Sequence, residues 1–161
     1  MARIDNEIRI TPSVFDRLLD FEPDVSSEAP KSRSKSLREL KQSVKRDLEW
    51  LLNTRRYAGE IPDNLEEVNK SVLIFGLPDF TGLGAKSSAE QKRLIKELES
   101  ALKIFEPRLM DVRVSFEPPS ETERVLKFRI EARMRVDPTP EPVTFDTILQ
   151  LGSGAYMVQE K

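Results

Sequence analysis

The spacing of apolar residues changes once along this chain of 161 residues, at Pro107. Before the proline, apolar residues recur three and four positions apart, which is typical of helices packed on one side. After it, apolar and charged residues alternate, which is typical of strands with one buried face. Helices followed by antiparallel strands predict an α+β fold, with about three helices on one face of a meander-like β-sheet.

Two helices are clearly marked before the proline. Ser36 and Glu39 have the spacing of a capping box, and the apolar stripe after them predicts a helix over 36–53. Ser87 and Glu90 have the same spacing, and the stripe that follows predicts a helix up to the proline, because the residue before a proline avoids helical backbone angles.

The segment between these helices has a weaker pattern. A stripe over 64–75 favours a helix that Gly76 and Pro78 would end. The β-branched content of 72–75 makes a strand the alternative there.

Alternation after the proline predicts four strands, over 110–116, 126–136, 143–151 and 155–159. Residues 1–35 differ from the rest, because prolines and serines crowd them. We predict a flexible arm over 1–35 and a single domain over 36–161. One short helix is expected in the arm, capped by Thr11, with Pro12 in its first turn.

Composition narrows the possible functions. The chain has no cysteine and no histidine, which excludes disulfides, thiolate metal sites and triads of the Ser-His-Asp kind. No cofactor or metal site is expected. No stretch approaches the roughly 20 apolar residues of a membrane helix, and no secretion signal is evident, so we expect a soluble cytoplasmic protein. A two-carboxylate glycosidase is the remaining enzyme alternative, with Glu106 as its best candidate acid.

The loop before the last predicted helix carries little functional signal. The loop over 82–87 precedes a helix and contains Lys86, but Ala85 and Phe80 occupy the positions where a phosphate-binding loop needs glycine, so it predicts a surface loop.

A basic row lies on one face of the second predicted strand. Acidic Glu131 shares this face and no aromatic residue interrupts it, so nucleic acid is not the expected partner. The row predicts a solvated face, or a strand that accepts a selected partner strand. Its members are Lys127, Arg129, Arg133 and Arg135.

The sequence Glu106, Pro107 and Arg108 stands at the joint between the last helix and the first strand. Pro107 ends the helix. The two charges predict either an ordinary intrachain ion pair or a rigid charged projection whose arginine contacts a carboxylate of a partner.

Several segments together resemble the TssE family, the baseplate subunits of type VI secretion systems, which are related to the sheath-initiating wedge protein of contractile phage tails. The family's hallmark is a Glu, Pro, Arg triplet after its last helix, and it falls on Glu106, Pro107 and Arg108. The other similar segments are 11–13 with 16–18, 44 with 47–56, 71–73 with 76–79, and 105–109.

The resemblance implies a structural adaptor rather than an enzyme. Such a subunit would sit in the baseplate wedge with TssF, TssG and TssK, at the membrane-docked baseplate but not inserted in the bilayer. The triplet would be its protein-binding site. The strand over 123–136 and the final hairpin would accept strands of the TssB and TssC sheath. Some family labels read lysozyme-like, but no catalytic pair carries over to this sequence.

Overall fold

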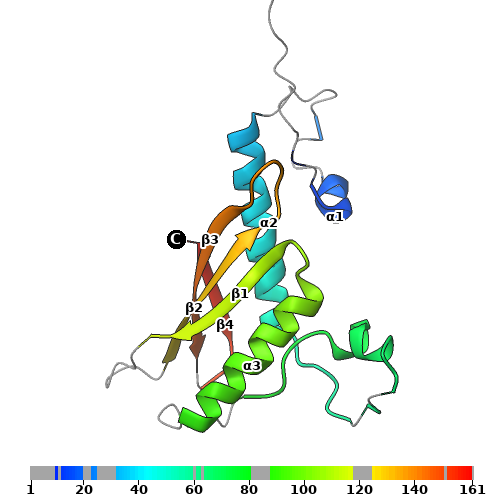
Figure 1. Ribbon diagram of the computed structural model, residues 1–161, viewed down its shortest axis with the longest axis vertical. Coiled ribbons are helices and arrows are strands. Elements are labelled where there is room, and N and C mark those ends of the chain that lie inside the picture. The colour runs from blue at the N-terminus through cyan, green and yellow to red at the C-terminus, as the bar shows by residue number, and fades with distance from the viewer. Residues whose placement is uncertain are drawn as a thin grey trace, which may run out of the picture.

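The computed structural model describes residues 10, 12–19, 23–24, 32–59, 61–62, 64–80, 88–117, 125–150 and 152–160. The helices are α1 (Val14–Leu18), α2 (Arg33–Asn53) and α3 (Ser88–Phe105), with two short 3-10 turns, η1 (Val68–Lys70) and η2 (Val72–Ile74). The strands are β1 (Leu109–Phe116), β2 (Val125–Met134), β3 (Glu141–Gln150) and β4 (Tyr156–Glu160). Helices precede strands, which confirms the predicted α+β fold (Figure 1).

The strands form one antiparallel sheet in the order β1-β2-β3-β4. Every strand pairs with its neighbour in sequence, so the sheet is a meander whose edges are β1 and β4. The prediction that the second strand accepts a partner strand is therefore wrong. All ten residues of β2 are in register with β3, from Val125 opposite Gln150 to Met134 opposite Glu141, and β1 pairs with the other side.

Only one face of the sheet is buried. Along β2, buried residues alternate with exposed or half-exposed ones, as the alternation in the sequence predicts. Helix α2 packs on β4 and α3 packs on β1, so both helices cover that face. The centre of the core consists of Val44, Leu48 and Leu52 from α2, Leu94, Leu98 and Leu102 from α3, and Phe128, Ile130 and Phe145 from the sheet.

Helix α2 begins three residues before the predicted Ser36. Ser32 is the N-cap, and its Oγ accepts the backbone N–H of Lys35 at 3.3 Å. Ser36 lies in the first turn and donates its hydroxyl to the Ser32 carbonyl at 3.1 Å. The division at residue 35 into arm and domain stays a prediction, and α2 extends across it. Ser87, the predicted cap of the last helix, lies outside the described residues.

The predicted helix over 64–75 is wrong, and so is its strand alternative. The segment forms the turns η1 and η2, separated by Ser71, whose backbone is extended and whose hydroxyl accepts the Leu73 N–H. Val72 is 86% exposed whereas Phe75 packs against the core, so the apolar residues read from the sequence as one stripe do not share a buried face. This part of the chain extends away from the sheet in Figure 1.

Two backbone hydrogen bonds attach the end of this segment to the end of α2. The N–H of Leu77 donates to the Thr54 carbonyl at 2.9 Å, and the N–H of Arg56 donates to the Leu77 carbonyl at 3.0 Å. Gly76 has a φ of +108°, and a Cβ there would lie 2.3 Å from the Thr54 carbonyl oxygen. The position therefore requires glycine for both backbone angle and space. Among the described residues, none of the helices is long and apolar enough to cross a membrane.

Gly76→Ala should lower the free energy of unfolding by about 1 to 3 kcal/mol, because alanine strains the backbone and collides with the Thr54 carbonyl. Gly152→Ala is the matched control, since its Cβ would meet nothing within 4 Å. Urea unfolding of both variants measures the difference. Equal stability of the two would show that the attachment at Leu77 tolerates a side chain.

Candidate functional site

The Glu106, Pro107 and Arg108 corner joins α3 to β1. The last turn of α3 continues through Glu106, whose N–H donates to the Leu102 carbonyl at 2.9 Å, and Leu109 donates to the Glu106 carbonyl at 3.0 Å. Pro107 is exposed at the corner, whereas Glu106 is only 3% exposed. The triplet therefore divides, with its proline outside and its carboxylate inside.

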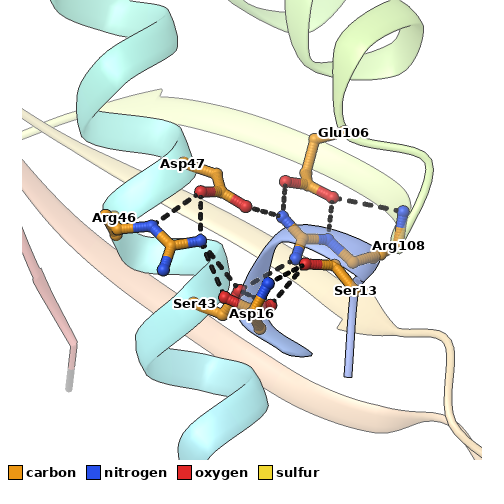
Figure 2. Close-up of polar contacts among 7 residues, drawn as sticks. All are labelled: Ser13, Asp16, Ser43, Arg46, Asp47, Glu106 and Arg108. Carbon is orange, nitrogen blue, oxygen red and sulfur yellow. Dashed lines mark hydrogen bonds and ion pairs between the residues drawn. The ribbon is translucent and has the colours of Figure 1, made fainter. Parts of the chain in front are cut away.

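The guanidinium of Arg108 fills the space between this corner and α2. Its Nε donates to Glu106 Oε1 at 2.6 Å and its NH2 to Glu106 Oε2 at 2.5 Å, a bidentate ion pair. The same NH2 group donates to Asp47 Oδ2 at 2.6 Å, and NH1 donates to the Ser43 hydroxyl at 3.1 Å (Figure 2). Burial lowers the pKa of Arg108, but the hydrogen bonds and charges of Glu106 and Asp47 outweigh it and raise the pKa.

The structure thus contains the intrachain ion pair that the sequence left open as one alternative. The other alternative, a projection holding both charges outward, is wrong for Glu106, because Arg108 folds back over that carboxylate. Glu106 is equally unsuited as the acid of a glycosidase. Both of its oxygens accept hydrogen bonds from Arg108, and the side chain is buried where a substrate cannot reach it.

A second arginine extends the network along α2. Arg46 donates from Nε and NH2 to Asp47 Oδ1 at 3.0 and 2.8 Å, and its NH2 also donates to Asp16 Oδ1 at 2.9 Å. Asp47 therefore bridges the two arginines, with one carboxylate oxygen for each. This bridge connects the corner at Arg108 to α1, which carries Asp16.

Asp16 attaches α1 to α2. The hydroxyls of Ser13 and Ser43 both donate to Asp16 Oδ2 at 2.6 Å, and the Asp16 N–H donates to Ser13 Oγ at 3.1 Å. Ser13 is thus the N-cap of α1, while Thr11, the predicted cap, lies outside the described residues. Ser43 is buried and contacts both Asp16 and Arg108, so it joins the two halves of the network.

Aromatic contacts complete the attachment of α1, which has no buried residue of its own. The rings of Phe15 and Trp50 meet edge to face at 5.7 Å between centroids. The guanidinium carbon of Arg46 lies 5.0 Å from the Phe15 centroid and 5.1 Å from that of Trp50. Cation–π contacts of this kind contribute roughly 0.5 to 1 kcal/mol at exposed sites. A short helix is thereby held mainly by charge and ring contacts.

The basic row lies on the open face of β2, as predicted, but acids on neighbouring strands neutralise part of it. Arg129 pairs with Asp146 of β3 at 2.7 Å and with Glu117 beside β1 at 2.8 Å. Arg133 pairs with Asp111 of β1. Sequence reasoning missed these pairs because they depend on strand register. Lys127 and Arg135 lie on the same face, half-exposed and exposed.

The remaining candidates from the sequence add no site. The loop over 82–87 lies outside the described residues. In the described part of the chain, no group of three or more acidic side chains is placed to hold a metal ion.

Glu106→Gln should destabilise the protein by about 1 to 3 kcal/mol, because Arg108 loses the charge of its bidentate partner inside the corner. Asp111→Asn is the matched control, since it removes the charge from the more exposed pair with Arg133 and should change stability little. Chemical denaturation compares the two. Similar losses would mean that the corner does not depend on its buried ion pair.

Asp16 makes the attachment of α1 depend on pH. Burial raises the pKa of Asp16, but hydrogen bonds from Ser13, Ser43 and Arg46, with the charge of Arg46, outweigh it and lower the pKa from 3.8 to about 2. Because the folded-state pKa is the lower one, the stabilisation is complete above about pH 4 and is lost as pH falls through about 2.

The single tryptophan, Trp50, should report this loss, because Phe15 and Arg46 lie on its ring. Wild-type fluorescence is expected to change between about pH 4 and about pH 2. Asp16→Asn should show the detached signal already at neutral pH, with the circular dichroism of the domain retained. An unchanged titration in that variant would assign the transition to other carboxylates.

Comparison with known proteins identifies a matching family and a similar solved structure. Residues 38–139 match the family described as "Baseplate wedge protein gp25". The solved structure titled "The baseplate complex from the type VI secretion system" contains a chain that is 21% identical, with a TM-score of 0.47, over 77% of this chain and 93% of that one. A similarity this low carries no functional argument. Comparison with curated proteins gives no match.

The family match spans most of α2, all of α3, β1 and β2, and every residue of the corner. It covers more than half of the chain and agrees with the resemblance to wedge proteins drawn from the sequence. The chain therefore belongs to the gp25 family of baseplate wedge proteins.

Proposed function

We propose that this chain is the TssE-type subunit of a type VI secretion baseplate, that it docks on TssF and TssG, and that it initiates the TssB and TssC sheath. The observation that carries the proposal is membership of the wedge family, whose matched region includes the corner and the α2 side of its network, Ser43, Arg46 and Asp47. The function is structural, and no reaction is assigned to the chain.

The corner at Pro107 is the proposed docking site. Arg108 is bonded to two acids and a serine on two different elements, so it positions the corner and has little freedom left for a partner. What a partner meets is the exposed ring of Pro107 and the 23% of the Arg108 side chain that remains accessible. Rigid presentation of this surface lowers the entropic cost of binding.

The open face of the sheet is the proposed sheath-facing surface. Its basic row, Lys127, Arg129, Arg133 and Arg135, is interleaved with acids, which suits a protein surface of mixed charge better than the phosphates of nucleic acid. In the proposed setting the chain lies in the cytoplasm, with TssK as a further partner, and is docked at the membrane as part of the assembled baseplate without entering the bilayer.

The two-carboxylate hydrolase is not proposed. Its best acid, Glu106, is buried, and both of its carboxylate oxygens accept hydrogen bonds from Arg108. We expect purified protein to leave peptidoglycan intact from acid to neutral pH.

Co-expression with TssF and TssG tests the docking site. Pro107→Glu places a charge on the exposed corner while leaving the Glu106 and Arg108 pair intact, so it should abolish recovery of the complex without changing the melting temperature. Gln159→Glu is the matched control, because it places the same charge at an exposed position of β4, and it should retain the complex.

The possible results distinguish a wrong docking site from a wrong function. A full complex with folded Pro107→Glu would show that docking occurs elsewhere on the chain. Absence of any complex with wild type would overturn the proposed role in a type VI wedge.

A further inference from the structure

Side chains of the helices hydrogen-bond to the outward backbone groups of both edge strands. We call an edge closed where these groups are occupied in this way, and the two edges are closed to different degrees. Backbone groups alternate along a strand, so every second residue of an edge strand directs its N–H and C=O away from the sheet. On β4 these residues include Tyr156 and Val158, and on β1 they include Val114. All three use their outward N–H in hydrogen bonds to side chains of α2 or α3.

Strand β4 is closed by α2. Asn53 Oδ1 accepts the Tyr156 N–H at 2.9 Å, and Asn53 Nδ2 donates to the Tyr156 carbonyl at 2.9 Å. One side-chain amide thus satisfies both backbone groups, as a residue of an added strand would. Glu49, one helical turn earlier, accepts the Val158 N–H at 3.3 Å.

A further hydrogen bond within α2 orients the Asn53 amide that closes β4, and another contact with α2 lies at the end of the strand. Asn53 Nδ2 also donates to the Glu49 carbonyl at 2.8 Å, which orients the amide. At the far end Lys41 of α2 forms an ion pair with Glu160 at 3.4 Å. A strand adding to β4 would have to displace the Asn53 and Glu49 side chains from the backbone of a strand of only five residues.

Strand β1 is longer and is closed at one point. Glu99 of α3 accepts the Val114 N–H at 3.0 Å. Within the described residues, no side chain is hydrogen-bonded to the backbone of the flanking Val112 and Phe116. A register shift between Met110 and Arg113 interrupts the start of the strand, which leaves 113–116 as the regular run.

We propose that a partner strand adds to β1 over its regular run, 113–116, with Glu99 leaving the Val114 N–H to admit it, while β4 stays closed. This assignment rests on the proposed sheath function and specifies which edge the sheath uses. Pairing along β1 would exchange one carboxylate contact for a ladder of backbone hydrogen bonds.

The side chains beside this edge define the chemistry of the partner segment. On the helix face, Val112 and Phe116 are only partly buried and would be covered by apolar residues of the added strand. On the open face, Arg113 is exposed and forms no ion pair within the described residues, unlike Arg129 and Arg133. The fitting segment is therefore extended, with apolar residues alternating with polar ones and an acidic residue opposite Arg113.

Site-specific crosslinking tests the choice of edge. The chain has no cysteine, so Ser115→Cys on β1 and Gln159→Cys on β4 each provide one exposed thiol for a benzophenone label. The labelled full chains are assembled with TssF, TssG, TssB and TssC and irradiated. We expect the yield of crosslinks to sheath subunits from the β1 position to be at least about five times the yield from the β4 position.

Each other outcome counts against the assignment. Equal yields, a higher yield from β4, or sheath growth with crosslinks from neither position would overturn it while leaving the sheath role standing. If the unlabelled wild-type wedge starts no sheath, the proposed function is wrong, and the β1 assignment falls with it.

Opening of the edge is tested through rates of sheath initiation. Glu99→Ala removes the carboxylate that blocks Val114 and should speed initiation about threefold to tenfold, the range expected for one net hydrogen bond. Glu49→Ala on α2, which removes the carboxylate that accepts the Val158 N–H of β4, is the matched control and should leave the rate unchanged. Faster initiation with Glu49→Ala alone would assign the strand to β4 instead.

Discussion

The bidentate pair between Arg108 and Glu106 is the interaction on which the arrangement of helices and sheet depends. A buried carboxylate is costly unless it is paired and fully hydrogen-bonded, and here the pairing arginine also reaches Asp47 and Ser43 of α2. One guanidinium therefore fixes the joint between α3 and β1 and the position of α2 at the same time. The conformation of the corner follows from charge satisfaction as much as from the proline.

The position of the two helices determines which backbone groups of the edge strands are accessible. Because α2 lies under β4 and α3 under β1, side chains from each helix reach the nearer edge. The corner network that sets the helix positions thereby also sets which backbone groups of the edges are occupied. The proposed docking site at the corner and the proposed site of strand addition at the edge are thus connected through the same two helices.

The sequence was sufficient for the elements with strong periodicity and insufficient for contacts that depend on register. The stripes of α2 and α3 and the alternation in the strands predicted the fold class. The turns around Ser71 were misread because their apolar residues, such as Val72, face outward. Asp16 and Asp47 lie in segments that resemble the family, but their contacts, and those of Ser43, could not be predicted, since the partners lie far away in the chain. Only the triplet itself was identifiable, and the direction in which Glu106 points was not.

The closed edges have a consequence for the subunit before assembly. An exposed strand edge is a template on which copies of a protein pair with one another, and charged or polar caps are one way in which sheets avoid this. With the outward N–H groups of Tyr156, Val158 and Val114 already occupied, two free copies that meet in solution find few backbone groups to share. The side chains that occupy these backbone groups would thereby keep unassembled subunits from forming fibrils.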